Sequence, residues 1–199
     1  MVVVIAIEGV HGCGKTTFIN KLKAAGRTVL EEGFMNDTMN DYNPTSIARQ
    51  TVWMANWIQR VTEVAQKMTR RTPIYIDRSM YSAIMYNDDN AEANAMRLLI
   101  EKSEKEMKDH GIVVIKVVIN DQKNDAWLNI GVRLQKEPER RTFNEHQKSH
   151  YDKIWHRYYE VYANTWDTAM EMPQTYCDDH AAIEALDNAV KGYMASAGI

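Results

Sequence analysis

The sequence predicts an α/β fold: a three-layer sandwich in which helices cover both faces of a mostly parallel, five-stranded sheet. Three observations support this class. Short apolar runs alternate with longer segments of helical periodicity. Glycine, proline and asparagine mark the boundaries between them. A glycine-rich loop also joins the first apolar run to the first helical segment. Alternation of this kind indicates a parallel sheet, in which ligands bind at the carboxyl ends of the strands.

The expected strands are apolar runs, and the expected helices lie between them. The strands cover residues 2–7, 28–31, 74–77, 112–119 and 175–177. The helices cover residues 15–25, 43–71, 91–109, 121–135, 145–170 and 181–197. Gly26 and Gly111 are expected to end the first and third helices. Asn43 is expected to cap the second helix, with Pro44 at its first position.

Length and composition indicate one soluble enzyme-sized domain over residues 1–199. Of the 199 residues, 45% are hydrophobic and 26% are charged, and the chain contains no repeat or low-complexity linker. The net charge of −3 argues against a nucleic-acid-coating surface. The two cysteines, Cys13 and Cys177, suit a reducing compartment. The apolar run after Met1 is too short to span a bilayer, so we expect no membrane contact and a cytoplasmic protein.

The most informative segment is residues 9–16, which matches G-x-x-x-x-G-K-[ST] in full. Such a loop cradles a polyphosphate with its backbone N–H groups, while Lys15 reaches the β and γ oxygens and the Thr16 hydroxyl ligates Mg²⁺. The positive end of the following helix faces the anion. The residues expected to bind the nucleotide here are Gly9, His11, Gly12, Cys13, Gly14, Lys15, Thr16 and Thr17.

Charged residues follow the second and third expected strands. Glu31 and Glu32 come at the end of the second strand, and Asp77 and Arg78 at the end of the third. The two glutamates should point to opposite faces, so only one of them is expected in the site. Asp77 is a candidate Mg²⁺ ligand through water, and Arg78 a candidate to neutralise charge on a transferred group.

A charged interval at about residues 133–145 lies between two expected helices. Charge runs of this kind are usually solvated connections. Beside a phosphate loop, however, arginines such as Arg133, Arg140 and Arg141 are typical of a lid that closes over the phosphates of ATP and excludes water. We therefore interpret the interval as an arginine-bearing lid.

Several segments together resemble the superfamily of deoxynucleoside kinases and thymidylate kinases. They are Ile5-Ala-Ile-Glu-Gly9 before the phosphate loop, Glu32 after the second strand, and Asp77-Arg-Ser-Met-Tyr-Ser82. The last of these is close to the Glu-Arg-Ser form of deoxynucleoside kinases, with Asp77 in place of the glutamate. The segment Thr45-Ser-Ile-Ala-Arg-Gln-Thr51 similarly resembles the family segment that ends in Phe-Gln-Thr.

The resemblance implies transfer of the γ-phosphate of ATP, with Mg²⁺, to the 5′-hydroxyl of a deoxyribonucleoside. Glu32 would be the general base, and Arg78 would pair with it and with the incoming phosphate. Gln50 would read the nucleobase, since an amide both donates and accepts hydrogen bonds. Tyr42 and Glu145 would contact the sugar 3′-hydroxyl. Members of these families are commonly homodimers, which the long helices here allow.

Departures from the family pattern leave the acceptor open between a nucleoside and a nucleotide. Gly33 replaces the proline that follows the family glutamate, and Glu31 stands where thymidylate kinases carry an arginine that grips the monophosphate. Trp57 stands where those enzymes read thymine with an arginine. These differences favour a nucleoside. Arg141-Thr-Phe-Asn and the later Tyr158-Tyr159, in contrast, resemble thymidylate kinase, so conversion of dTMP to dTDP remains the alternative.

Two further points have more than one interpretation. Gln50, Trp53 and Trp57 share one face of the expected helix, so the tryptophans either wall a slot for the base or belong to the core. The scattered histidines are expected in solvated or core positions, with His11 exposed in the phosphate loop. An ATPase or nucleotide-dependent switch that transfers nothing is the remaining class, and the acceptor-side motifs argue against it.

Overall fold

The computed structural model describes residues 1–31, 43, 45–68, 72–87, 89–120, 123–171 and 179–198. Within them, five strands form one sheet in the order β2-β3-β1-β4-β5. The strands are β1 (Val2–Glu8), β2 (Thr28–Leu30), β3 (Ile74–Asp77), β4 (Ile112–Asn120) and β5 (Thr168–Glu171). Thr28 of β2 pairs in parallel with Ile74 of β3, and Val117 of β4 with Thr168 of β5. The predicted α/β class with a parallel five-stranded sheet is confirmed.

Burial along the strands follows their place in the sheet. All four residues of β3 and the last five residues of β1 are buried. The edge strands are more exposed, and Met170 is the one residue of β5 that is buried. Central parallel strands are covered on both faces and are therefore continuously apolar, whereas edge strands are not. This difference explains why the sequence predicts the central strands well and the last strand poorly.

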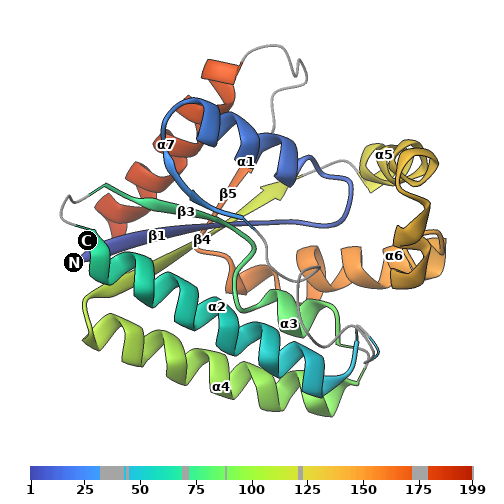
Figure 1. Ribbon diagram of the computed structural model, residues 1–199, viewed down its shortest axis with the longest axis horizontal. Helices are drawn as coiled ribbons and strands as arrows, with labels where there is room; N and C mark the ends of the chain where they lie inside the picture. The colour runs from blue at the N-terminus through green and yellow to red at the C-terminus, as the bar shows by residue number, and fades with distance from the viewer. Residues whose placement is uncertain are drawn as a thin grey trace. The chain divides into compact units, whose positions relative to one another are not determined.

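Helices follow most of the strands (Figure 1). The α-helices are α1 (Lys15–Ala24), α2 (Ile47–Lys67), α3 (Ser82–Met85), α4 (Asn90–Asp109), α5 (Lys123–Lys136), α6 (Lys148–His156) and α7 (Asp179–Ala197). Shorter turns are the 3₁₀ helices η2 (Pro138–Phe143) and η4 (Ala163–Thr165) and the π-helix η3 (Arg157–Val161). Within the described ranges, no helix has the length and apolar character needed to cross a membrane.

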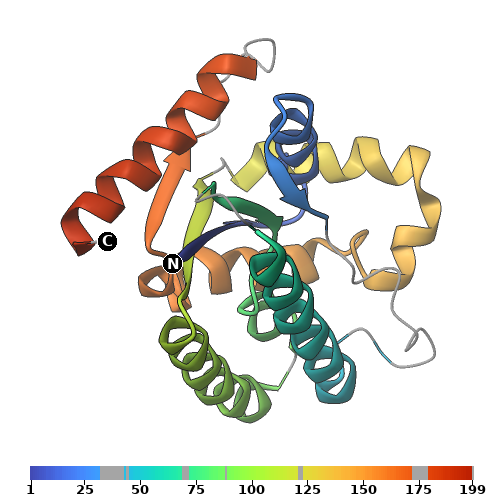
Figure 2. The same cartoon turned by 60° about the vertical axis from the view of Figure 1, so that its left-hand side comes forward.

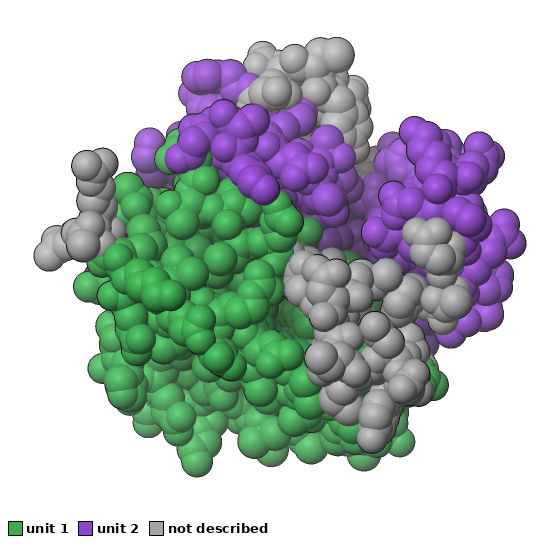
Figure 3. Space-filling model, in the orientation of Figure 1, with its two compact units in different colours: residues 1–6, 27–115 green, residues 7–26, 116–199 purple. Residues whose placement is uncertain are grey.

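The chain divides into two compact units, which Figure 3 colours separately. Unit 1 comprises residues 1–6 and 27–115, and unit 2 comprises residues 7–26 and 116–199. Strands β1 and β4 are each divided, because their first residues belong to unit 1 and their last residues to unit 2. Unit 2 therefore contains the phosphate loop and the charged interval, and unit 1 contains α2 and the end of β3.

In unit 1, helices α2 and α4 run side by side in both views (Figures 1 and 2). Helix α2 begins later than expected, because Ser46 has the extended backbone of a cap and its hydroxyl accepts a hydrogen bond from the Arg49 N–H at 3.4 Å. The expectation that Asn43 caps this helix is wrong. The Asn43 side chain instead accepts from the backbone N–H and the hydroxyl of Thr45, both at 3.1 Å.

In unit 2, the expected continuous helix over residues 145–170 is wrong. Helix α6 ends at His156 and is followed by the π-helix, a 3₁₀ turn and β5. The hydroxyl of Tyr158 donates to the Glu8 carboxylate at 2.8 Å, and that of Tyr159 to the carbonyl of Ile119 at 2.7 Å. Consecutive side chains of the π-helix thus contact the ends of two strands, β1 and β4.

Strand β5 begins where Asp167 pairs with β4. The Lys116 N–H donates to the Asp167 carboxylate at 2.7 Å, and the Asp167 N–H donates to the Lys116 carbonyl at 3.0 Å. These contacts of Asp167 with β4 override the helical pattern of the sequence at the start of β5. The spacing of apolar residues does not reveal them. The expected strand at residues 175–177 lies outside the described residues.

Candidate functional site

The phosphate loop connects β1 to α1 and depends on glycine at three positions. Gly9, Gly12 and Gly14 have φ angles of 148°, 82° and 89°. These values lie in the left-handed region, which side chains other than glycine's rarely allow. Gly14 is also the N-cap of α1, so the first N–H groups of the helix open towards the loop. The loop therefore has the backbone needed to bind an anion at a helix N-terminus.

Lys15 is directed back into the loop. Its ammonium donates to the carbonyls of Gly9 at 2.6 Å and Val10 at 2.8 Å and lies 3.7 Å from the sulfur of Cys13. Only 6% of the residue is exposed. A buried cation among backbone dipoles is the group that a polyphosphate requires at this position.

Helix α5 packs directly on the phosphate loop. A Cβ at Gly12 would lie 2.2 Å from the carbonyl oxygen of Ala126, and the Asn129 amide donates to the Gly12 carbonyl at 3.0 Å. Gly12 is thus required both by its backbone conformation and by this close approach. Thr16 and Thr17, in the first turn of α1, are exposed.

Glu145 is the centre of an ion cluster that links the charged interval to the phosphate loop. Its carboxylate accepts from Arg133 of α5 and lies 3.4 Å from Arg140 of η2 and 3.4 Å from Nδ1 of His11. Glu137 pairs with Nε of Arg140. The expectation that His11 is exposed is wrong, because its side chain is only 14% exposed and faces Glu145.

The cluster also affects the ionisation of its members. Burial opposes the charge of Arg140, but the hydrogen bond to Glu137 and the charges of Glu145 and Glu137 outweigh it and raise the pKa of the guanidinium. The hydrogen bond from Arg140 lowers the pKa of Glu137. Arg141 is exposed and lies in a separate hollow of about 470 Å³ along α5.

In unit 1, Arg78 directly follows β3 in a strained conformation. Its φ of 69° lies in the left-handed region, which costs a residue with a side chain about 1–3 kcal/mol. Its guanidinium donates to the Tyr86 hydroxyl at 2.8 Å and lies 4.9 Å from the centre of the Tyr86 ring. Strain of this kind is concentrated at functional positions. The sequence indicates Arg78 by its charge, by its place after the third expected strand and by the resemblance of residues 77–82.

Three residues of α2 that the sequence proposes for the base are buried. Gln50 and Trp57 are 2% exposed and Trp53 is 5% exposed. The Trp57 indole donates to the Arg78 carbonyl at 2.9 Å, and this hydrogen bond supports the strained turn. For Trp57, the structure therefore favours the core interpretation over a wall of the pocket.

The remaining predicted residues are only partly described. Asp77 ends β3 and is 5% exposed. Glu31 is exposed after β2, and its carbonyl accepts from Arg60 at 2.5 Å. Glu32 and Tyr42 lie outside the described residues.

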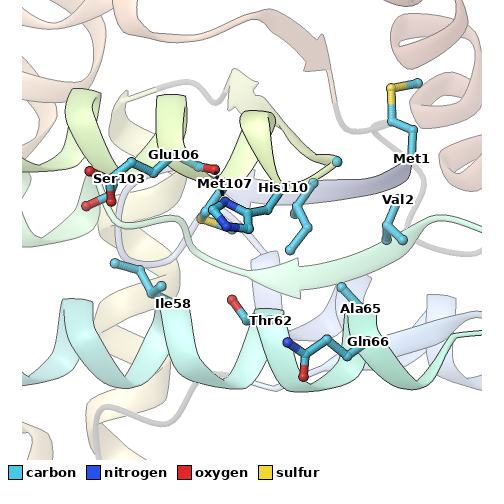
Figure 4. A pocket seen from close by; sticks show the side chains of 12 residues that line it. Met1, Val2, Ile58, Thr62, Ala65, Gln66, Ser103, Glu106, Met107 and His110 are labelled. Carbon is cyan, nitrogen blue, oxygen red and sulfur yellow. Dashed lines mark hydrogen bonds between the residues drawn. The ribbon is translucent and has the colours of Figure 1, made fainter.

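A groove of about 660 Å³ in unit 1 contains none of the predicted residues (Figure 4). It lies at the amino ends of β1 and β4, where Ile58 and Thr62 of α2 face Met107 of α4 and His110, which follows that helix. Ligand sites in parallel α/β sheets lie at the opposite, carboxyl ends of the strands. The groove is therefore a poor candidate for the nucleotide.

Sequence reasoning missed two contacts around the phosphate loop. Glu8, fully buried at the end of β1, accepts from Tyr158. His11 and Glu145 are 134 residues apart in sequence, and no spacing rule connects them. The sequence contains one indication that Glu8 belongs to this region, which is its position immediately before the first glycine of the motif.

Comparison with known proteins assigns the chain to a family. Residues 4–169 match the family described as AAA domain. The chain belongs to this AAA domain family. No curated protein matches the sequence.

Solved structures show which fold this member of the AAA domain family has. Deoxyadenosine kinase from M. mycoides, solved with products dCMP and a flexible dCDP, is 15% identical with a TM-score of 0.54, over 95% of this chain and 99% of the kinase. The same kinase with bound dATP is 16% identical with a TM-score of 0.57, over 94% and 99%. NadR protein in complex with NAD and AMP-PNP is 12% identical with a TM-score of 0.57, over 96% of this chain and 50% of NadR. The chain thus has a P-loop kinase fold similar to that of deoxyadenosine kinase.

Proposed function

We propose that the protein transfers the γ-phosphate of ATP to the 5′-hydroxyl of a deoxyribonucleoside. The observation that carries this proposal is the phosphate loop, with Lys15 directed into it and α1 opening behind it. Catalysis would consist mainly of positioning and charge neutralisation. Lys15 would hold the terminal phosphates, and the segment 133–145 would act as a lid within a single kinase domain.

On the acceptor side, the proposal gives each residue a separate role. Glu32 orients the 5′-hydroxyl and accepts its proton, and Arg78 stabilises charge on the transferred group. Gln50 reads the base and Trp53 flanks it, while Tyr42 contacts the sugar. The strained backbone of Arg78 supports this assignment, because strain of this kind is costly and is concentrated at functional positions.

Mg²⁺ fits the oxygen ligands that the chain offers. The Thr16 hydroxyl and the Asp77 carboxylate are hard donors of the kind that Mg²⁺ prefers. Thr16 is in the exposed first turn of α1, and Asp77 ends a central strand. The ion would supply charge neutralisation for the phosphates of the donor.

A substrate screen tests the proposal. Purified protein is incubated with Mg-ATP and, separately, with each of the four deoxynucleosides and dTMP, and the products are separated by charge. Nicotinamide nucleosides belong in the same panel, since one structural neighbour was solved with NAD. A deoxynucleoside monophosphate supports the proposal. Turnover of dTMP alone would instead establish a thymidylate kinase.

Glu32→Gln tests the acceptor chemistry. The amide keeps the size of the side chain but cannot accept the proton, so we expect ATP binding to persist while transfer falls by roughly 10²–10⁴-fold. Unaltered turnover in this variant would remove Glu32 from the mechanism.

A further inference from the structure

Glu145 is one of the most buried charged residues in unit 2. It follows Asn144, which has a left-handed φ of 59°, and only 2% of its side chain is exposed. A carboxylate in such a place is stable only when it is paired with cations and hydrogen-bonded. All three partners of Glu145 described above are basic side chains.

The partners come from three different segments of unit 2. Arg133 is near the end of α5, Arg140 is in η2, and His11 is in the phosphate loop. One carboxylate oxygen accepts from Arg133, and the other lies 3.4 Å from both Arg140 and His11. Glu145 therefore joins the two arginines to the loop.

The arginines keep enough donors to bind an anion as well. A guanidinium has five N–H donors in a fixed plane. Arg133 uses one nitrogen for Glu145, and Arg140 uses Nε for Glu137 and one terminal nitrogen for Glu145. The side chains of Arg133 and Arg140 are still 25% and 27% exposed. Glu145 thus holds both guanidinium groups in place and leaves some of their N–H donors available to bind an anion.

We propose that Glu145 is a positioning residue that holds Arg133 and Arg140 beside the phosphate loop, ready to contact the terminal phosphate of the donor. This role rests on the proposed function and replaces the sugar contact that the sequence suggested for Glu145. It also explains why His11 is turned towards the lid segment. Pre-positioning lowers the entropy cost of ordering two long side chains when the nucleotide binds.

Glu145→Gln tests this role through the nucleotide alone. The amide removes the negative charge and directs an N–H₂ group at cations. We expect the affinity for ATP, measured by calorimetry without acceptor, to fall about tenfold, because charge-assisted hydrogen bonds are lost. The affinity for ADP should change less than about twofold, since the arginines serve the terminal phosphate. Equal ATP affinity in folded Glu145→Gln and wild type overturns the proposal.

The matched control is Asp152→Asn. It removes the same charge from an exposed i, i+4 pair with Lys148 on α6, whose two side chains are 43% and 41% exposed. We expect no change in ATP affinity from this variant. Equal losses in Asp152→Asn and Glu145→Gln would indicate an effect of net charge and contradict the proposal.

A second variant covers the case in which Glu145→Gln does not fold. His11→Ala keeps the carboxylate and both arginines and removes the imidazole that links Glu145 to the loop. We expect the affinity for ATP to fall by roughly threefold, a larger loss than for ADP. Unaltered ATP affinity here would show that the link to the loop has no positioning effect.

Transfer assays separate this role from a sugar contact. With an active nucleoside substrate, positioning predicts the same fold-loss in Glu145→Gln for the nucleoside and its 3′-deoxy analogue, and an unchanged KM for both. If the defect of Glu145→Gln disappears with the 3′-deoxy analogue, Glu145 contacts the sugar 3′-hydroxyl and the positioning role is wrong. If wild type transfers no phosphate, the proposed function fails, while the calorimetric comparison still decides the role of Glu145.

Discussion

The phosphate loop in unit 2 and the Arg78 turn in unit 1 both follow a buried strand, but they are built differently. In the loop, glycine backbone and a lysine bonded to loop carbonyls determine the shape. At Arg78, a residue with a side chain adopts the left-handed conformation and is supported by Trp57 and Tyr86 from elsewhere in unit 1. The conformation of the loop therefore depends mainly on its own residues, with α5 packed against it at Gly12, whereas the turn depends on side chains from other elements. Substitutions in the loop and at the residues that contact the Arg78 turn should therefore have different effects.

The largest effect is expected from Lys15→Met. It removes the cation from the loop while retaining an apolar stem of similar length, so phosphate transfer should fall by roughly 10³-fold. Steady-state kinetics and ATP calorimetry measure the loss. Lys23→Met, an exposed position at the other end of α1, serves as control and should retain activity. Comparable activity in Lys15→Met and Lys23→Met would contradict the donor role of Lys15.

Gly12→Ala should be next in size. The new Cβ meets the Ala126 carbonyl and the left-handed φ is unfavourable, which together cost about 3 kcal/mol of unfolding free energy. Denaturant unfolding and ATP affinity report the effect. Gly131→Ala in α5 is the matched control. Its Cβ meets nothing within 4 Å, so this variant should be stabilised by about 0.5–1 kcal/mol. Similar effects at both glycines would contradict the close-packing argument.

Trp57→Phe tests the tertiary support of the Arg78 turn. Loss of the indole donor to the Arg78 carbonyl should destabilise the protein by about 1–2 kcal/mol and lower kcat, since the turn aims the guanidinium. Tyr86→Phe keeps the ring beside Arg78 but removes the hydroxyl that accepts its hydrogen bond. We expect a smaller loss of stability from Tyr86→Phe. If both variants retain the wild-type kcat, the support of the Arg78 turn has no role in catalysis.

The smallest effect is expected from pH at the lid cluster. Because Arg140 lowers the pKa of Glu137, the pair contributes stability above the ordinary glutamate pKa of 4.5, and this stability is lost as the pH falls through the lowered value. The contribution should be modest, since the Glu137 side chain is 43% exposed. Thermal unfolding between about pH 3 and 5 should show a weaker pH dependence in Glu137→Gln. An identical pH dependence in Glu137→Gln and wild type would show that the Glu137–Arg140 pair does not contribute to stability.

The same contrast explains what the sequence could predict. The phosphate loop and the central strands β1, β3 and β4 follow from local motif and continuous apolarity. The break after His156 and strand β5 did not follow, because tertiary contacts such as Asp167 with Lys116 outweigh the local pattern. The Ser46 cap did not follow because Asn43 and Pro44 give a competing local signal for the start of the helix. In the site, the glycine-rich motif identified Lys15, and its place after the third strand together with the family resemblance identified Arg78. The ion cluster at Glu145 was not, because it joins residues from three segments.

In the proposed function, the phosphate loop and the acceptor-side residues together transfer phosphate from ATP to a deoxynucleoside. The most direct test follows the label from γ-labelled Mg-ATP in the presence of the four deoxynucleosides. We expect label in a deoxynucleoside 5′-monophosphate and little label in inorganic phosphate. Label released only as inorganic phosphate, at a rate independent of added nucleoside, would contradict the proposed transfer and identify an ATPase.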